Sequence, residues 1–366
     1  MQLLYRSSRY LLPTLFLGYA LVANTVFLER WDKPLIAPGA SVLTGAVTAD
    51  LDHVYKTTLP HRDLSIGLVG AARYLLTGEG RAGVIGGQDG WLFTNEESRP
   101  LTQGLDDAIA PILAVQDSLG AAGVRLVIVP IPAKMDIYSD KADQPQLSAA
   151  MATDYSRFVA ALQVSGVPVV DTRPALIHAR DNGPVYFATD THWNADGAGT
   201  VAVTVAASGL LPVGTTDFVT QSMPDQTFVG DLVSFVTSES LAPHVGLPGE
   251  HIQPYLAVAA KAGGPVDLFG TTQADIVLVG TSYSANPRWS FAEALKLALR
   301  QDVLNFAEEG QGPARPMETY LASSDFRDTP PRVVVWEFPV RYLSDPTIWD
   351  GKPQPRRSNQ EIASAT

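Results

Sequence analysis

Two short polar segments contain residue types that can do nucleophilic chemistry. Residues 189–194 read TDTHWN and stand directly before a helical pattern, while residues 279–284 read VGTSYS and follow an apolar run. At the end of such a run, a glycine permits the tight bend that exposes a serine hydroxyl beside backbone N–H groups. A serine needs a base, and an imidazole base needs a carboxylate to orient it. The candidate triad is therefore Ser282 as nucleophile, His192 as base and Asp190 as orienting acid.

Less reactive interpretations of both segments stay open. A serine at a strand end often only caps a helix, and an Asp-x-His pair can cap a helix through Asn194 or form part of a metal site. A metal needs further ligands, but the other histidines are scattered without ligand spacing: His53, His61, His178, His244 and His251. We therefore expect no metal. Ser284 is a second candidate nucleophile, and Trp193 is either a packing residue or a substrate platform.

The elements that must position these residues alternate between short apolar strands and amphipathic helices. This alternation predicts an α/β fold with a mostly parallel sheet flanked by helices. The predicted strands are 125–131, 167–170, 276–279, 303–306 and 332–336, and the predicted helices are 105–120, 147–163, 194–208 and 290–300. In open α/β sheets, ligand sites gather at the carboxyl ends of the strands. Asp171, Ser282 and Glu337 each follow such a strand, so we expect the site at that edge.

The N-terminus reads as a membrane anchor. Arg6 and Arg9 precede an uncharged apolar run over residues 10–28, which is long enough as a helix to cross a bilayer. A cleaved signal peptide and a buried soluble helix are the alternatives, although no small-x-small cleavage site is evident. Because basic residues stay in the cytoplasm, we expect a cytoplasmic N-terminus (1–9), a single-pass anchor (10–28) in the inner membrane and the remaining chain in the periplasm.

The other parts of the chain differ in composition. Residues 29–80 read as a linker followed by short helices, 81–345 as the catalytic domain, and 346–366 as a polar, disordered tail. Within the domain, the Gln-Asp-Gly turn at 88–90 predicts a hairpin, and the Gly- and Pro-rich stretch 211–270 predicts irregular insertion loops.

Composition narrows the class of protein. The chain has 366 residues, of which 46% are hydrophobic, so it can bury a sizeable core. Its formal charge of -12 argues against nucleic acid as a partner, since nucleic-acid binders usually carry a basic excess. The absence of cysteine excludes thiol nucleophiles, disulfides and cysteine-based metal sites.

Several blocks together resemble the alginate O-acetyltransferase family, whose members are SGNH-hydrolase-like proteins of exopolysaccharide acetylation. The segment 190–194 (DTHWN) is similar to that family's signature, and 280–284 (GTSYS) to its nucleophile block. Further similar blocks are GQDGWLF at 87–93, VPIPAK at 129–134, EGQGP at 309–313 and VWEFPVRY at 335–342. The blocks occur in the family's order and cover roughly residues 81–345.

The resemblance implies a three-layer SGNH-hydrolase-like fold with permuted motif order, in which the Asp-His block precedes the serine block. It assigns Asp190, His192 and Ser282 the triad roles reached above. Gly312 would be the counterpart of an oxyanion-hole glycine, and Tyr283 and Arg341 would be candidate oxyanion or substrate-binding residues. Alternatively, Arg341 could form a structural ion pair with Glu337.

The resemblance also implies a reaction and a partner. Ser282 would be acetylated and would pass the acetyl group to a hydroxyl of an exopolysaccharide such as alginate. Acetyl-CoA is cytoplasmic and the sequence shows no suitable nucleotide loop, so we expect no bound cofactor. A membrane-bound O-acyltransferase of the MBOAT type would supply the acetyl group. The alternatives are an acetyl esterase of the same fold and a non-catalytic polysaccharide-binding assembly protein.

Overall fold

A computed structural model describes residues 2–30, 44–58, 62–99, 101, 104–260 and 275–349. Its centre is a four-stranded sheet in the order β3-β10-β8-β9, in which every neighbouring pair is parallel. The strands are β3 (Arg125–Ile131), β8 (Ile276–Val279), β9 (Val303–Asn305) and β10 (Val333–Pro339). The predicted parallel sheet is confirmed. The expected strand at 167–170 is wrong, because it is reduced to a single bridge between Val169 and Ile128.

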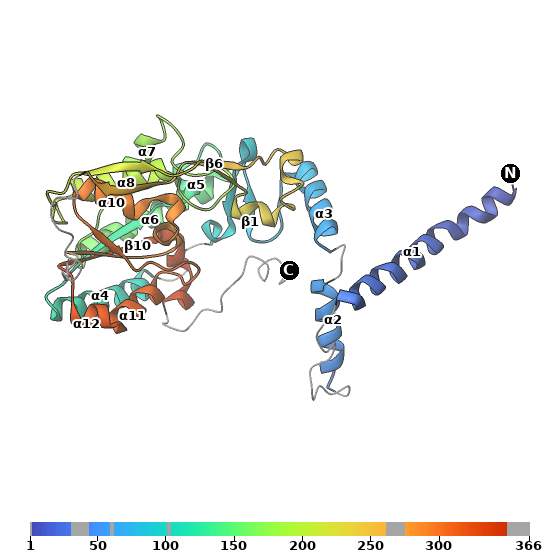
Figure 1. Cartoon of the computed structure of the whole chain (residues 1–366), viewed down its shortest axis with the longest axis horizontal. Coiled ribbons are helices and arrows are strands. Elements are labelled where there is room, and N and C mark those ends of the chain that lie inside the picture. The colour runs from blue at the N-terminus through green and yellow to red at the C-terminus, as the bar shows by residue number, and fades with distance from the viewer. Residues whose placement is uncertain are drawn as a thin grey trace.

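Helices cover both faces of this sheet and make three layers (Figure 1). Because side chains alternate along a strand, Val333 and Val335 of β10 face one core while Val334 and Trp336 face the other. The first core is closed by α8 (Ala195–Ala207) and α10 (Phe291–Leu299). The second is closed by α4 (Asp106–Ala121), α6 (Pro145–Val164) and α11 (Ala314–Ala322). Strands buried on both faces explain the continuous apolar runs of the sequence.

Shorter elements complete the layers. The three-layer body also contains four shorter helices: α5 (Lys134–Ile137), α7 (Arg173–Ala179), α9 (Ser282–Ala285) and α12 (Ser324–Asp328). The 3-10 turns are η1 (Gln88–Gly90), η2 (Asn95–Ser98), η3 (Asp231–Phe235), η4 (Ala242–Val245), η5 (Pro287–Trp289), η6 (Val340–Ser344) and η7 (Pro346–Ile348). Trp349, beyond η7, is buried and its ring lies 5.4 Å from that of Phe338.

The predicted hairpin is present and forms a two-stranded sheet of its own. β1 (Val84–Gly86) and β2 (Leu92–Thr94) are antiparallel. Asp89 and Gly90 between them have φ angles of 55° and 78°, the left-handed conformation that a tight Asp-Gly turn requires. The Leu92 N–H donates to the carbonyl of Ala188 over 2.9 Å, so the hairpin is tied to the chain just before the Asp-x-His segment.

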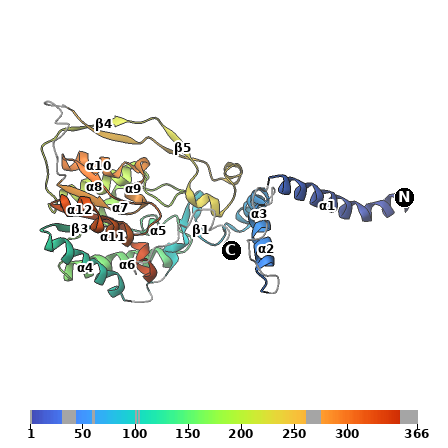
Figure 2. The same ribbon diagram turned by 60° about the horizontal axis from the view of Figure 1, so that its bottom comes forward.

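The insertion is more regular than the composition predicts. Residues 211–270 were expected to be irregular, but they contain the antiparallel pairs β4 (Phe218–Ser222) with β7 (Tyr255–Ala259), and β5 (Gln226–Phe228) with β6 (Glu250–Ile252). These ribbons lie along one side of the three-layer body (Figure 2). Their pairing is long-range and follows no local turn signal, so composition alone could not reveal it.

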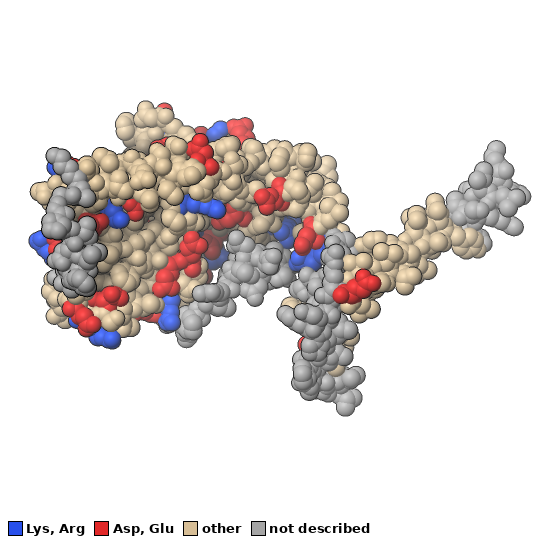
Figure 3. Space-filling model, in the orientation of Figure 1, with Lys and Arg blue, Asp and Glu red and all other residues tan. Residues whose placement is uncertain are grey.

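The first two helices stand apart from the three-layer body (Figure 1), whereas the third packs against the insertion, where the hydroxyl of Thr237 donates to the carbonyl of Gly67 over 2.8 Å. These three helices follow one another along the chain: α1 (Gln2–Arg30), α2 (Ala46–Thr58) and α3 (Arg62–Thr77). The stretch Tyr10–Glu29 of α1 is long and apolar enough to cross a membrane. Most of its apolar side chains are exposed, with Leu12 at 78% exposure, although Ala23 and Phe27 are buried. α1 shows almost no charge along its described surface (Figure 3). The expected tail lies mostly outside the described residues.

Candidate active site

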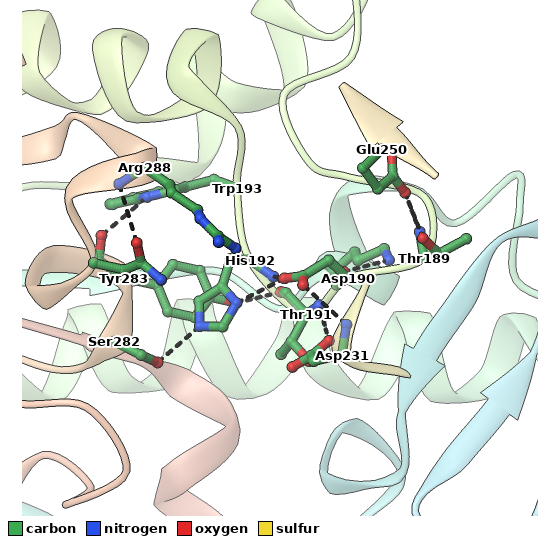
Figure 4. Close-up of polar contacts among 12 residues, drawn as sticks. Thr189, Asp190, Thr191, His192, Trp193, Asp231, Glu250, Ser282, Tyr283 and Arg288 are labelled. Carbon is green, nitrogen blue, oxygen red and sulfur yellow. Dashed lines mark hydrogen bonds and ion pairs between the residues drawn. The ribbon is translucent and has the colours of Figure 1, made fainter. Parts of the chain in front are cut away.

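The three predicted triad residues meet at the carboxyl edge of the sheet (Figure 4). The Oγ atom of Ser282 lies 2.7 Å from Nε2 of His192, and Nδ1 of His192 lies 2.7 Å from Oδ1 of Asp190. Ser282 is the first residue of α9, directly after β8, while the other two precede α8. The structure therefore brings together two segments that are 90 residues apart in the chain.

The protonation pattern follows from these contacts. An ionised carboxylate can only accept hydrogen bonds, so Nδ1 of His192 donates to Asp190 and leaves Nε2 free to accept from the Ser282 hydroxyl. Burial raises the pKa of Asp190, but the adjacent imidazole and the hydrogen bonds outweigh it and lower the pKa. Burial lowers the pKa of His192, but the Asp190 carboxylate outweighs it and raises the pKa. The imidazole is thus prepared to take a proton.

A second carboxylate, Asp231 of η3, supports the Asp-x-His loop. Its two oxygens accept hydrogen bonds from the N–H and the hydroxyl of Thr191 over 2.8 and 2.7 Å. In return, its own N–H donates to Oδ2 of Asp190 over 3.0 Å. Burial and the negative charge of Asp190 raise the pKa of Asp231 to about 6. Sequence reasoning missed Asp231, because it lies in the insertion and belongs to no local motif.

Removal of the Asp231 charge should change the pH dependence of turnover. Asp231 is one of the charges that raise the pKa of His192, and the base works only when it is neutral. In Asp231→Asn, the pKa of the base falls, so the acidic limb of kcat/KM moves to lower pH. Thr191 can rotate its hydroxyl to accept from the new amide, which keeps the loop in place. A pH profile beside that of the exposed control Asp225→Asn tests this, and an unmoved limb contradicts it.

A buried lysine fixes the same loop from the other side. Lys134 of α5 is 1% exposed, and its Nζ donates to the carbonyls of Leu92, Ala188 and Asp190 over 2.6, 2.9 and 2.9 Å. Burial lowers the pKa of this amine to about 8. All three N–H groups of the ammonium are used, so Lys134 joins the β1–β2 hairpin to the backbone of the orienting carboxylate. Residues of the sequence blocks 87–93, 129–134 and 190–194 therefore come together at this ammonium group.

The turn that contains Ser282 is held by a carboxylate from the neighbouring strand. Glu337 of β10 is fully buried, and it accepts from the N–H and hydroxyl of Thr281 and from the Ser284 hydroxyl over 3.0, 3.0 and 2.6 Å. Gly280 is required here, because an added Cβ would lie 2.5 Å from Oε2 of Glu337. Ser284 is only 3% exposed and its hydroxyl is committed to Glu337, whereas Ser282 is accessible. This geometry favours Ser282 as the nucleophile.

The expected pairing of Glu337 with Arg341 is wrong. Arg341 of η6 instead places Nε 2.9 Å from Oε2 of Glu96, while Glu337 serves the serine turn. Arg341 also donates to the hydroxyl of Tyr283, which in turn donates to the carbonyl of Thr191 over 2.7 Å. Both side chains are buried, so the geometry shows them as supports of the loop.

Two further predicted residues have clear positions. Gly312 has a φ of 66° in the loop before α11, and an added Cβ would meet Ile348 at 3.0 Å. Among the described residues, no hydrogen bond joins Gly312 to Ser282, and its role in an oxyanion hole stays a prediction. Trp193 is fully buried and its Nε1 donates to the carbonyl of Tyr283 over 3.2 Å, so it packs and does not line the site.

A metal interpretation has one geometric basis. Asp190, His192 and Asp231 offer ligand atoms that lie within 4.8 Å of one another. However, Nδ1 and Nε2 of His192 already contact Asp190 and Ser282, so a cation would have to displace one of these bonds.

Comparison with known proteins places this site in a family. Residues 84–340 match the model described as the SGNH hydrolase-like domain of the acetyltransferase AlgX. The chain is 39% identical to the "probable alginate O-acetylase AlgJ" of Pseudomonas aeruginosa over 340 residues, which cover 89% of this chain and 85% of the relative. An AlgJ of Azotobacter vinelandii with the same name is 36% identical, over 84% of this chain and 81% of the relative.

Solved structures agree with the sequence relatives. The O-acetyltransferase domain of Pseudomonas putida AlgJ superposes with a TM-score of 0.61 at 33% identity, covering 72% of this chain and 93% of that domain. Pseudomonas aeruginosa AlgX superposes with a TM-score of 0.60 at 24% identity, covering 73% and 65%, and so supports the fold. The three-layer architecture, the Ser–His–Asp arrangement and these matches agree, and the chain belongs to the family of SGNH-hydrolase-like acetyltransferases that includes AlgJ and AlgX.

Proposed function

We propose that this protein transfers acetyl groups to an exopolysaccharide through an acetylated Ser282. The observation that supports the proposal most directly is the chain of 2.7 Å contacts from Ser282 through His192 to Asp190. The relatives add the substrate class: those with 39% and 36% identity are named alginate O-acetylases, so alginate is the first acceptor to test.

The proposed reaction has two halves, and the geometry of the three side chains supports both. In the first, Oγ of Ser282 attacks the acetyl carbonyl while its proton passes to Nε2 of His192, and the donor's leaving group departs with that proton. In the second, a sugar hydroxyl gives its proton to Nε2 and attacks the acetyl-serine. Collapse of the resulting tetrahedral intermediate releases the acetylated sugar, and the proton on Nε2 returns to Oγ of Ser282.

Backbone N–H groups at the start of α9 can stabilise the oxyanion of both halves. Ser282 occupies the first position of this helix, where an N–H has no carbonyl four residues earlier in the helix to bind. Thr281 caps the next N–H, that of Tyr283, with its side chain. The Ser282 N–H donates no hydrogen bond among the described residues, so we assign it as a donor to the oxyanion.

The decisive assay follows the acetyl group to its destination. The full chain in detergent is supplied with a small activated acetyl ester and a mannuronate oligomer, and mass spectrometry counts acetyl groups on the sugar while released acetate is measured in parallel. We expect sugar acetylation that depends on Ser282. Acetate release without sugar acetylation would make the protein an esterase. Sugar binding without acetylation of Ser282 would make it a non-catalytic assembly protein.

We further propose that α1 anchors the protein in the inner membrane with the catalytic domain in the periplasm. The exposed apolar stretch Tyr10–Glu29 supports this orientation together with the basic residues before it. Acetyl-CoA is then on the other side of the membrane, so a membrane-bound O-acyltransferase would deliver the acetyl group. A reporter fused after residue 35 should be active only outside the cytoplasm, and cytoplasmic activity contradicts both the orientation and the need for this partner.

A further inference from the structure

An exposed arginine, Arg288, lies close to the triad. Arg288 belongs to η5, which follows α9 directly, and its N–H is held by the side-chain oxygen of Asn286 over 3.0 Å. The side chain is exposed, and in the view of Figure 4 it extends towards His192. Within the described residues, no carboxylate forms an ion pair with Arg288, and its guanidinium carbon lies 5.4 Å from the ring centre of Phe228.

Aromatic rings connect this guanidinium to the catalytic base. Trp289 stacks on the imidazole of His192, with the ring centres 5.2 Å apart and the planes at 24°. Phe228 of β5 lies 5.7 Å from Trp289, and Phe187 packs against both rings at 5.1 and 5.3 Å. Phe228 is only partly buried, so this aromatic wall between the base and Arg288 presents a partly exposed ring beside the guanidinium.

The guanidinium of Arg288 beside an aromatic ring suits a sugar that has a carboxylate. A planar guanidinium binds a carboxylate through two parallel hydrogen bonds, and a ring below it fixes its plane. The chain as a whole has a charge of -12 and would repel a polyanion, so an anionic acceptor needs a local cation at the point of reaction. A hexuronate has its carboxylate on the same ring as the hydroxyls that receive acetyl groups, and its C–H face suits an aromatic wall.

We propose that Arg288 and Phe228 form an acceptor subsite that binds the carboxylate of a uronate residue in the polysaccharide. The subsite rests on the proposed transferase function and specifies its acceptor. With the carboxylate at Arg288 and the sugar against Phe228, the acceptor lies along the aromatic rings that lead to His192, whose Nε2 takes the proton of the reacting hydroxyl. Arg288 acts by binding and has no part in the acylation of Ser282.

The test compares Arg288→Gln with wild type and with the control Arg327→Gln, whose exposed arginine lies on α12. Calorimetry of the full chain in detergent measures binding of a mannuronate oligomer and of the same oligomer with its carboxylates reduced to alcohols. We expect Arg288→Gln to weaken binding of the uronate oligomer roughly tenfold and to leave binding of the reduced oligomer unchanged. Acylation of Ser282 by a small acetyl ester should stay within about twofold of wild type, since this half-reaction does not involve the acceptor.

Other outcomes overturn the subsite. Equal affinity of wild type and Arg288→Gln for the uronate oligomer, equal weakening for both oligomers, or no binding of the uronate oligomer by wild type each contradict it. The transferase function is tested separately by the acetyl groups that wild type places on the oligomer. If acetyl passes from Ser282 only to water, the transferase function fails, while the binding comparison still decides whether Arg288 recognises the carboxylate.

Discussion

Ser282→Ala abolishes acetyl transfer, with a loss of roughly 10⁴-fold or more, while the free energy of unfolding changes by no more than about 1 kcal/mol. The physical reason is that Oγ is the only atom removed, and its hydrogen bond goes to Nε2 of His192. In the described part of the chain, Oγ of Ser282 makes no other hydrogen bond. Transfer rates and denaturant unfolding of the same preparation measure both quantities.

The neighbouring serine provides the matched control. Ser284 donates its hydroxyl to the buried Glu337 over 2.6 Å, so Ser284→Ala removes one donor from a buried carboxylate and should cost about 1–3 kcal/mol of stability. That variant should still acylate Ser282. The two serines, two residues apart, thus separate chemistry from structure. Transfer that survives in Ser282→Ala and disappears in Ser284→Ala would reverse the assignment.

A double variant tests whether serine and histidine act as one unit. His192→Ala should be nearly as damaging as Ser282→Ala, and the double variant should lose little more, because members of one catalytic unit are strongly non-additive. Losses that multiply would mean that His192 acts independently of the Ser282 proton. The 2.7 Å contact between Oγ and Nε2 is the basis for expecting a single unit.

Asp190→Asn should lower turnover by roughly 10³–10⁴-fold with little change in fold. Oδ1 of Asp190 accepts from Nδ1 and from the backbone N–H of His192, and Oδ2 accepts from the N–H of Asp231. An amide has one acceptor and one donor, so its NH₂ group must face an N–H on one side or the other. If it faces Nδ1, the imidazole adopts the tautomer that cannot accept the serine proton.

The control for this prediction is Asp196→Asn, because Asp196 is an exposed acid in the first turn of α8. It has the same chemical change without contact to the imidazole and should keep wild-type turnover. Near-normal activity of Asp190→Asn would show that the carboxylate does not select the tautomer.

A chelator separates the triad from a metal site in the same assays. If Asp190, His192 and Asp231 held a required cation, chelation would abolish activity and added zinc would restore it. The triad needs no cation, so we expect turnover that is insensitive to chelator in wild type. A chelator-sensitive activity that zinc restores would replace the proposed mechanism.

Much of the fold could be predicted from local patterns. The run 276–279 is a strand of exactly those residues, and the helices expected at 147–163 and 290–300 are present within about two residues at each end. These segments could be predicted because buried strands and amphipathic helices show their burial in their own residue pattern. The prediction of a strand at 167–170 was wrong, because only one bridge, between Val169 and Ile128, pairs this segment with its neighbour.

The sequence by itself determined the chemistry that is available: a serine after a strand, a histidine with an acid two residues before it, and an apolar N-terminal helix. Only the tertiary structure decided how these residues are held. Asp231, Lys134 and Glu337 reach the two loops from an insertion, a short helix and a neighbouring strand. Buried charged groups must find hydrogen-bond partners, but these partners lie between 41 and 56 residues away along the chain, where local periodicity has no information.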